Sequence, residues 1–415
     1  MAATARVHSD YVPIDDPDFY INDPWPTFAW MQAEQPFYYY APLNTFVLTR
    51  YKDIRDVSVQ PNLFINSRGT FLNDIKYKDR VQDSTITDSF FPKDGEQVGT
   101  TDPPRHQDLR RVIMPAFSIP AMEALRDPVT DHITSMLDAI EPGKPVEWME
   151  YAAAMPITAA CHLIGLPATD HKRVQYGSDE LEKLGGDLSF EQINQAAQDF
   201  QSLQNYIVEN VERRKATGDT NGVDLLSVLL NAELDNDKVT MGNVVMFAMT
   251  AMAAGSDTTR AMLAGIVHCL ADNPDQWTLL RENRKLVGNA IEEVIRWVTP
   301  ARAFLRVAVE DTEVNGQQIK EGQALYLMYM AANRDETAFV DAGKFDVTRK
   351  DASRHLAFGA GPHLCAGMRL ARMEGVIMLN ALLDRFSKVE LAGTPQPVRH
   401  IIRNSWSSLP ATFTV

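Results

Sequence analysis

The sequence predicts a mainly α-helical protein with a small β region. From Asp102 onward, stretches with helical periodicity follow one another along most of the chain. Strand patterns rich in aromatic and β-branched residues occur within residues 36–60 and again within 303–328. The chain has 415 residues, of which 45% are hydrophobic, so it can bury a large core.

The individual elements follow from local patterns. Residues 36–60 predict two strands and a helix, with a turn at Pro42 to Asn44. Residues 61–100 lack strong periodicity and carry scattered aromatic side chains, which predicts a lid or binding loop. Within 303–328, Asn315-Gly316 predicts a hairpin turn. Helices are predicted at 105–116, 120–140, 146–164, 190–214, 222–232, 240–271, 275–282 and 284–298.

Composition narrows the class of protein. No Gly/Ser-rich linker and no internal repeat divides the chain, so we expect residues 1–415 to form a single domain. A net charge of −15 disfavours nucleic acid as a partner. The chain has only three cysteines, and an odd, small number argues against a disulfide framework. This indicates a reducing compartment. With polar, acidic first residues as well, we expect a soluble, cytoplasmic protein.

One stretch has almost the length of a membrane span. Residues 239–256 carry no charge. However, Asn243, several Thr and Gly residues and the DTTR segment that follows favour a buried core helix. We therefore expect no membrane anchor.

The most informative motif surrounds Cys365. In FGAGPHLCAG, the residues Phe358, Gly361, Cys365 and Gly367 have the spacing F-x-x-G-x-x-x-C-x-G, and the glycines and a proline allow tight turns. A helical pattern follows, and backbone N–H groups at a helix start favour a thiolate over a thiol. A thiolate on a stiff loop beside a ring-sized apolar space suits a haem iron, which needs a strongly electron-donating axial ligand. The alternative is an ordinary buried cysteine.

This segment resembles the haem-binding loop of the cytochrome P450 monooxygenases. The resemblance extends over nearly the whole chain, because further motifs occur in the family's order. It implies the cytochrome P450 fold and a haem b (iron protoporphyrin IX) whose iron is bound by Cys365. It also implies that Ala254, Phe358 and Gly367 contact the haem, and that one oxygen atom from O2 is inserted into a C–H bond of an apolar small molecule.

A second motif, AGSDTT, lies in the middle of the long helix predicted at 240–271. Gly255 and two adjacent threonines are poor choices for a helix interior, and Asp257 needs a partner or solvent in such apolar surroundings. A threonine hydroxyl can bond to a carbonyl one turn back and bend the helix. By resemblance, Thr258 would stabilise the activated oxygen species and Asp257 would relay protons from water. Otherwise the motif is a kinked helix whose aspartate caps a neighbouring element.

A third motif, EEVIRW, places Glu293 and Arg296 on one helix face. Taken alone, this is an ordinary surface ion pair. By resemblance it is the family's structural E-x-x-R element, which an arginine before a Phe-Asp pair usually completes. Here Lys344 occupies that place, and lysine cannot make a planar bidentate contact. Arg349 is the candidate substitute.

Four basic residues match family positions that bind the haem propionates, which need cationic or hydrogen-bonding partners. His106 and Arg110 lie four residues apart on one predicted helix. Arg306 follows a predicted strand start, and His363 precedes Cys365 by two residues. Arg105 and Arg111 are interpreted as surface charges.

The substrate pocket is predicted from helical spacing and from the resemblance. Counting back from Thr258, small residues fall on the same face of the long helix, which leaves room above the haem. By resemblance, further walls come from 65–91, 301–304 and 401–402. Arg302 would either anchor a substrate carboxylate or carbonyl or face solvent. The predicted pocket residues are Thr250, Ala253, Ala254, Phe304 and Ile402.

The expected partners are an apolar substrate, O2 and a separate electron donor. No P-loop or GxGxxG fingerprint is present, so we expect no fused flavin or nicotinamide domain, and 50 residues after Cys365 leave no room for a reductase. The resemblance implies a ferredoxin with its NAD(P)H-dependent reductase. Arg369 and Arg372 would meet an acidic ferredoxin or solvate their helix.

Two other functions stay open at this stage. One is a peroxygenase or isomerase with the P450 fold, which needs no redox partner, and the other is a haem-binding sensor or carrier. Asp257 and Thr258 count against both, because relatives of the first kind commonly lose this pair and ligand storage has no use for it.

Overall fold

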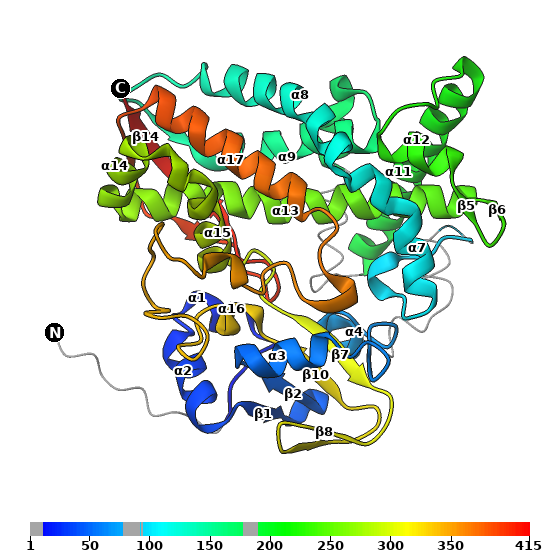
Figure 1. Cartoon of the computed structure of the whole chain (residues 1–415), viewed down its shortest axis with the longest axis vertical. Helices are drawn as coiled ribbons and strands as arrows, with labels where there is room; N and C mark the ends of the chain where they lie inside the picture. The colour runs from blue at the N-terminus through cyan, green and yellow to red at the C-terminus, as the bar shows by residue number, and fades with distance from the viewer. Residues whose placement is uncertain (1–10, 78–91, 93, 177–189) are drawn as a thin grey trace.

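The computed structural model describes residues 11–77, 92, 94–176 and 190–415. Helices dominate, and the five-stranded sheet lies at one end of the molecule (Figure 1). The mainly α fold with a small β region is therefore confirmed. The longer helices are α2 (Trp25–Glu34), α3 (Tyr51–Ser58), α7 (Arg105–Ile113), α8 (Ile119–Leu137), α9 (Trp148–Ile164), α11 (Phe190–Thr217), α12 (Leu225–Asn231), α13 (Met241–Asp272), α14 (Pro274–Glu282), α15 (Val287–Val298) and α17 (Met368–Arg385). The short ones are α1 (Pro17–Ile21), α4 (Leu72–Lys76) and α16 (Tyr329–Ala332).

Helix ends differ from the predicted ones by a few residues, because capping side chains decide them. The helix predicted at 222–232 begins at Leu225, since the Asp224 carboxylate accepts a hydrogen bond from the Ser227 N–H at 3.0 Å. At α13, the Thr240 hydroxyl accepts a hydrogen bond from the Asn243 N–H at 3.1 Å. Such caps satisfy backbone donors that have no partner inside the helix.

Helix α13 is the central element of the helical part. Its 32 residues span about 48 Å at about 1.5 Å per residue. It packs against α9, α15, α17 and α11, which surround it in Figure 1. Because neighbours cover it on several sides, its charge-free first half is buried inside the protein. None of the helices in the described part of the chain has the length and apolarity needed to cross a lipid bilayer.

The main sheet has the strand order β1-β2-β10-β7-β3. Strands β1 and β2 form the hairpin predicted within 36–60, and β10 pairs with β2 in parallel and with β7 antiparallel. The predicted Asn315-Gly316 turn joins β8 to β9, and both residues have positive φ (47° and 90°), as a tight hairpin turn requires. The strands of the main sheet are β1 (Phe37–Tyr40), β2 (Thr45–Leu48), β3 (Phe64–Ile65), β7 (Phe304–Ala308) and β10 (Ala324–Leu327), whereas β8 (Thr312–Val314) and β9 (Gln317–Ile319) form a separate two-stranded sheet.

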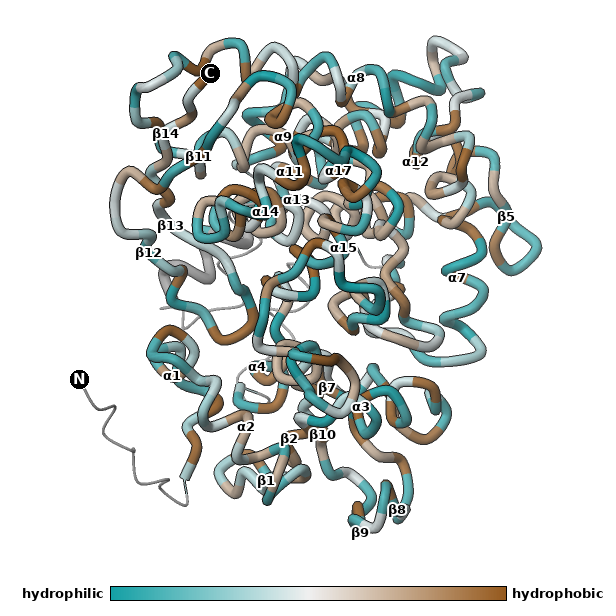
Figure 2. The backbone as a smooth tube through the Cα atoms, turned by 60° about the vertical axis from the view of Figure 1, so that its left-hand side comes forward, coloured by the Kyte–Doolittle hydropathy of each residue, from teal (hydrophilic) through white to brown (hydrophobic). Residues whose placement is uncertain are grey.

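The other small sheets were not predicted, because their strands are too short to show periodicity. Strands β11, β14 and β4 form a three-stranded sheet, and β5–β6 and β12–β13 form two-stranded ones. Their bounds are β4 (Pro145–Glu147), β5 (Glu233–Leu234), β6 (Asp237–Lys238), β11 (Lys388–Leu391), β12 (Gln396–Pro397), β13 (Trp406–Ser408) and β14 (Pro410–Thr414). The outer hairpins β5–β6 and β8–β9 carry mostly hydrophilic residues (Figure 2).

The core consists of one large cluster among the helices and two smaller clusters beside the main sheet. The large cluster draws residues from Leu109 to Phe413, so distant parts of the chain share it. The single domain at 1–415 stays a prediction. In the predicted lid, residues 61–77 include β3 and α4, whereas residues 78–91 and 93 lie outside the described part of the chain.

Candidate active site

A cavity of about 550 Å³ lies between α13, α7, β7, the Cys365 loop and the carboxy-terminal segment. Its size falls within the range typical of small-molecule sites. Apolar side chains form most of its wall. Every residue predicted to bind the cofactor, to act in catalysis or to line the pocket borders this cavity: Asp257, Thr258, His106, Arg110, Arg306, Phe358, His363, Cys365, Gly367, Thr250, Ala253, Ala254, Phe304 and Ile402.

The Cys365 loop has the tight backbone that its glycines predict. Gly359 and Gly361 have positive φ values of 74° and 70°. A Cβ atom on Gly361 would lie 2.2 Å from the Ser58 carbonyl oxygen, so that position excludes a side chain. The Cys365 N–H donates to the Phe358 carbonyl at 2.9 Å, which closes the loop. The loop backbone therefore holds the sulfur in a fixed position.

The electrostatics of Cys365 differ from the sequence-based expectation. The side chain is exposed to the cavity that it lines, and α17 begins three residues later. Burial among protein atoms raises the pKa of the thiol, whereas the backbone N–H groups of Gly367 and Met368 and the guanidinium of Arg110 lower it to a smaller extent. Helix-start donors alone therefore do not produce a thiolate here, because desolvation of the anion outweighs them.

Basic side chains converge on one wall of the cavity. His106 is fully buried, and its ring centroid lies 4.0 Å from that of His363. Within the described part of the chain, neither ring nitrogen of His106 nor Nε2 of His363 has a hydrogen-bond partner. Burial is the main cause that lowers the pKa of both rings, and the neighbouring basic groups His106, Arg306 and Arg110 help to lower that of His363 to about 3. Buried donors without partners are costly, so this wall suits anionic groups.

Each of the two arginines of this wall uses one N–H group to donate a hydrogen bond to a backbone carbonyl. Arg110 Nη2 donates to the Leu364 carbonyl at 2.6 Å and thus also supports the Cys365 loop. Arg306 Nη1 donates to the Leu305 carbonyl at 2.7 Å. The remaining N–H groups of each guanidinium are available for the carboxylates of a haem, and the donor set fits such a group.

The AGSDTT motif lies on the part of α13 that faces the cavity. The Thr258 hydroxyl donates to the Ala254 carbonyl one turn back at 2.8 Å, as its position predicts. The helix nevertheless runs without interruption from Met241 to Asp272. Asp257 is buried and has charged partners, because its Oδ2 lies 2.8 Å from Arg403 Nη1 and its Oδ1 lies 3.6 Å from Arg260 Nη1. The prediction that this carboxylate needs partners is confirmed.

The E-x-x-R pair is buried rather than exposed. Glu293 and Arg296 are both 0% exposed and form a bidentate ion pair at 2.7 and 2.8 Å. Arg349 Nε lies 3.2 Å from Glu293 Oε1, so Arg349 supplies the third partner. Lys344 contributes its backbone carbonyl to both arginines, and its side chain is exposed. Arg349 therefore makes the contact with Glu293 that an arginine at position 344 would make in the family's pattern.

Arg302 neither anchors a substrate nor faces solvent, so both sequence-based alternatives were wrong. The side chain is 1% exposed and does not border the cavity. It donates to the backbone carbonyls of His400 and Arg403 and lies over the ring of Tyr20. Burial lowers its pKa to about 10. Arg302 therefore organises the carboxy-terminal segment that carries Ile402 into the cavity.

Of the two arginines that closely follow Cys365, Arg372 is held by an ion pair, whereas Arg369 is exposed. Arg372 forms a bidentate pair with Glu292 at 2.6 and 3.0 Å and lies 4.8 Å from the centroid of the Phe358 ring. Burial opposes ionisation of Glu292, but the nearby imidazole of His355, at 3.4 Å, and the hydrogen bonds from Arg372 lower its pKa to about 2. Arg369 donates to the Phe117 carbonyl at 3.4 Å. Arg372 thus supports the structure around the Cys365 loop.

Arg105 and Arg111 were interpreted as surface charges. Arg111 is 73% exposed in its side chain and pairs with Asp108 on the same helix, which confirms the interpretation. Arg105 is more constrained, because it pairs with Glu96 at 2.5 Å and with Asp235 at 2.7 Å.

The sequence-based reasoning missed Arg403. It borders the cavity and approaches Asp257 from a segment 146 positions away. A single arginine in the irregular stretch before β13 carries no periodicity or spacing that could reveal this contact.

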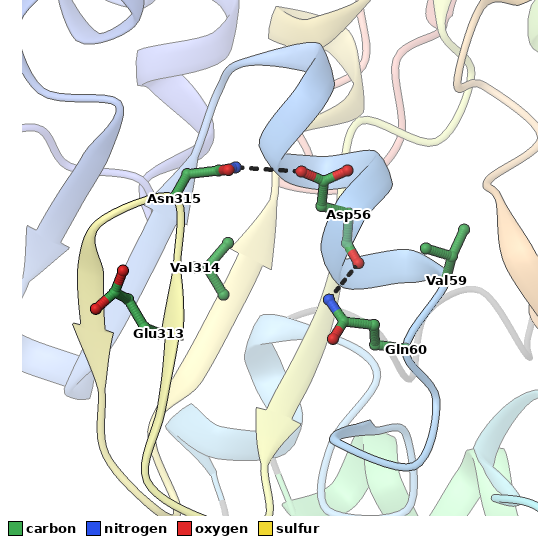
Figure 3. Close-up of a pocket in the computed structure, with 6 residues that line it drawn as sticks. All are labelled: Asp56, Val59, Gln60, Glu313, Val314 and Asn315. Carbon is green, nitrogen blue, oxygen red and sulfur yellow. Dashed lines mark hydrogen bonds between the residues drawn. The ribbon is translucent and has the colours of Figure 1, made fainter.

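A second hollow, of about 230 Å³, lies at the surface between α3 and the β8–β9 hairpin (Figure 3). The residues that line it are different from those that line the large cavity. Asn315 Nδ2 donates to Asp56 Oδ2 at 3.3 Å, and Gln60 donates to the Asp56 carbonyl, so these polar groups largely satisfy one another.

The fold and the cavity define a protein of the haem-thiolate class, and comparison with known proteins identifies the family. Residues 187–404 match the family model of cytochrome P450. Steroid C26-monooxygenase of Rhodococcus jostii is 28% identical over 92% of this chain and 81% of its own length, and linalool 8-monooxygenase of Pseudomonas putida is 29% identical over 95% and 97%. The solved cytochrome P450-153 from Novosphingobium aromaticivorans has a TM-score of 0.86 at 29% identity, over 97% of this chain and 99% of that chain. The chain therefore belongs to the cytochrome P450 family.

Membership confirms several of the sequence-based predictions. Members of this family bind haem b through a cysteine thiolate, and the chain is an oxidoreductase of the monooxygenase type. The predicted P450 fold is confirmed as well.

Proposed function

We propose that this monooxygenase hydroxylates an apolar small molecule of terpenoid, steroid or fatty-chain type, with electrons from a separate ferredoxin and its NAD(P)H-dependent reductase. The observation that carries the proposal is a cavity bordered by Cys365, by the Asp257-Thr258 pair and by a mainly apolar wall. The names of two relatives, a steroid monooxygenase and a linalool monooxygenase, support an apolar substrate.

Haem b would occupy the part of the cavity beside the Cys365 loop. Cys365 would bind the iron, and Phe358, Gly367 and Ala254 would pack against the macrocycle. The propionates would accept hydrogen bonds from the basic wall formed by His106, Arg110, Arg306 and His363. Bound haem supplies the activation of O2 and the transfer of one oxygen atom to a C–H bond.

The electrostatics of Cys365 also fit a bound cation. Burial raises the pKa of the free thiol, because a buried thiolate has lost its solvation. A metal cation bound to the sulfur would offset that loss and take the place of the thiol proton. The N–H groups of Gly367 and Met368 would then hydrogen-bond to the bound sulfur and limit its basicity.

Asp257 and Thr258 would control protons on the α13 side of the cavity. The Thr258 hydroxyl donates to Ala254 and can accept a hydrogen bond from water or from a reacting oxygen. The Asp257 carboxylate can take a proton from solvent and release it toward Thr258. Cleavage of the O–O bond consumes two protons, so this pair has a defined role in oxygen insertion.

The substrate would lie above the haem. Thr250 and Ala253 on α13, Phe304 on β7 and Ile402 on the carboxy-terminal segment line this space. An activated oxygen atom reacts with the C–H bond that lies nearest, so these side chains decide which carbon is hydroxylated.

Ferredoxin would dock on the Cys365 side of the protein. Arg372 is partly buried and paired with Glu292, whereas Arg369 is exposed, so we infer that Arg372 acts there through the local charge and Arg369 as a surface side chain. A cytoplasmic location also stays a prediction, which rests on the sparse cysteines of the sequence.

The test is reconstitution of the purified protein with haem, a ferredoxin and its reductase. Candidate terpenoids, steroids and fatty acids are first screened for the low-to-high spin shift of the haem on binding, and the compounds that bind are then assayed for oxygenated product. Turnover with peroxide in the absence of ferredoxin would favour a peroxygenase. Compounds that bind but are never oxidised would favour a sensor or carrier.

A further inference from the structure

Arg403 connects the carboxylate of Asp257 to the wall that a substrate would touch. Its Nη1 lies 2.8 Å from Asp257 Oδ2, and both side chains border the cavity. The preceding residue, Ile402, borders the same cavity. Arg403 thus follows the predicted substrate contact directly in sequence and contacts the predicted proton carrier.

The backbone that carries Arg403 is held firmly. The Arg302 N–H donates to the Ile402 carbonyl at 2.8 Å, and the buried Arg302 guanidinium donates to the carbonyls of His400 and Arg403. His400 Nδ1 accepts hydrogen bonds from the N–H groups of Ile402 and Arg403 at 2.9 and 3.1 Å. Because this segment is anchored by buried groups, the base of the Arg403 side chain has a fixed position relative to α13.

The second partner of Asp257 would draw the carboxylate in another direction. Arg260 lies one turn further along α13, and its Nη1 is 3.6 Å from Asp257 Oδ1. The contact with Arg403 is therefore the shorter of the two. An aspartate side chain has only two torsions, so the partner that holds it determines where its oxygen atoms lie.

We propose that Arg403 is a positioning residue that holds the Asp257 carboxylate toward the cavity for proton delivery. Substrate packed against Ile402 would restrict the neighbouring Arg403 side chain, so proton delivery would depend on a filled pocket. Without Arg403, the carboxylate turns toward Arg260, and protons reach the oxygen less efficiently. This inference rests on the proposed function of the cavity. It adds that substrate binding beside Ile402 controls proton delivery by Asp257.

The first experiment compares Arg403→Gln and Arg403→Lys in the haem-loaded enzyme with ferredoxin and reductase. The measurements are product formed per NAD(P)H consumed and the substrate dissociation constant from the spin-state titration. Arg403→Gln should lower the product per electron about tenfold, as expected for a misplaced catalytic group, and change the dissociation constant less than about twofold. Arg403→Lys should restore at least about half of the product yield, because a single N–O contact joins the pair.

A matched control is available at Arg399, on the same carboxy-terminal segment as Arg403. Arg399 pairs with Asp18 on the surface and is 64% exposed in its side chain. Arg399→Gln should behave like wild type. Unchanged product per electron in Arg403→Gln would overturn the proposal. A dissociation constant that rises about tenfold without rescue by lysine would also overturn it, because Arg403 would then be a substrate anchor.

A second measurement needs no substrate. The thermal midpoints of haem-loaded Arg403→Gln, Asp257→Asn and the double variant form a double-mutant cycle. We expect the double variant to lose no more than the larger of the two single losses, because each single change removes the same contact. Additive losses would show that the pair does not form and would overturn the inference. Failure of the wild type to oxidise any compound would instead count against the proposed function. The double-mutant cycle would still show whether Arg403 and Asp257 interact.

Discussion

Arg349 Nε lies 3.2 Å from Glu293 Oε1, inside a site where Glu293 and Arg296 are both fully buried. The contact completes a buried network of one carboxylate and two guanidinium groups. Arg349 also donates to the backbone carbonyls of Asp341 and Lys344, both at 2.8 Å, so it ties the segment before the Cys365 loop to α15. The network explains how the chain keeps the E-x-x-R element although Lys344 stands where the family usually has arginine.

Arg349→Leu should destabilise the protein by about 3 kcal/mol, because it leaves part of a buried ion network and several backbone carbonyls without partners. The matched control, Lys344→Leu, should change stability by less than about 0.5 kcal/mol, since that side chain is exposed. Urea unfolding of both variants measures the difference. Equal shifts in the two midpoints would contradict the assignment of Arg349.

Cys365→His should abolish the red-shifted Soret band of the ferrous carbon monoxide complex, because an imidazole donates less charge to the iron than a thiolate does. The visible spectrum of the reduced, CO-treated protein provides the measurement. Cys161 and Cys269 are buried elsewhere, so Cys269→Ala serves as the control and should keep the band. Persistence of the band in Cys365→His would mean that another residue binds the iron.

Thr258→Ala should keep the haem and divert reducing equivalents to hydrogen peroxide, since the variant lacks the hydroxyl of a residue that borders the cavity. Peroxide released per NAD(P)H consumed measures the effect. Ser256→Ala is a close control, because its hydroxyl makes the same kind of helix contact, to the Met252 carbonyl at 2.7 Å, but Ser256 does not border the cavity. An undiminished product yield in Thr258→Ala would refute its role.

Arg110→Leu should release haem faster, by about tenfold, because a propionate would lose a charge-assisted hydrogen bond and the Leu364 carbonyl would lose its donor. Transfer of haem to an excess of a haem-free acceptor protein measures the rate. Arg111→Leu, on the same helix but 73% exposed, should leave the rate unchanged. Equal rates for both variants would remove Arg110 from the haem site.

Stability should fall in acid partly through His400. Burial, together with Arg403 and Arg302, lowers the pKa of His400 from 6.5 to about 4 in the folded protein. Below pH 6.5 the His400 side chain binds a proton in the unfolded chain but not yet in the folded protein, which favours unfolding. The free energy of unfolding is therefore unaffected by His400 above pH 6.5 and falls as the pH is lowered from 6.5 to about 4. The loss is at most about 3 kcal/mol. In His400→Asn this part of the acid sensitivity should vanish, which urea midpoints from pH 7 to pH 4 would reveal, and an unchanged profile would contradict it.

The sequence by itself determined the elements and motifs whose signal is local. The helices have regular spacing of apolar residues, the Asn315-Gly316 turn needs two residues that tolerate positive φ, and the Cys365 loop needs glycine where no Cβ fits. The residues predicted to bind the cofactor, to act in catalysis and to line the pocket could be named before any contact was known, and all of them border one cavity, while their individual roles stay predictions.

Tertiary structure alone decided how these motifs are supported. Arg302 turned inward to bind backbone carbonyls, Arg349 replaced Lys344 as the partner of Glu293, and Arg403 reached Asp257 from a segment near the carboxy-terminal end. Tertiary packing likewise decided that burial raises the pKa of Cys365. The physical reason is the same in each case: a long, flexible charged side chain or a desolvated atom is governed by neighbours distant in sequence, and local patterns do not encode them.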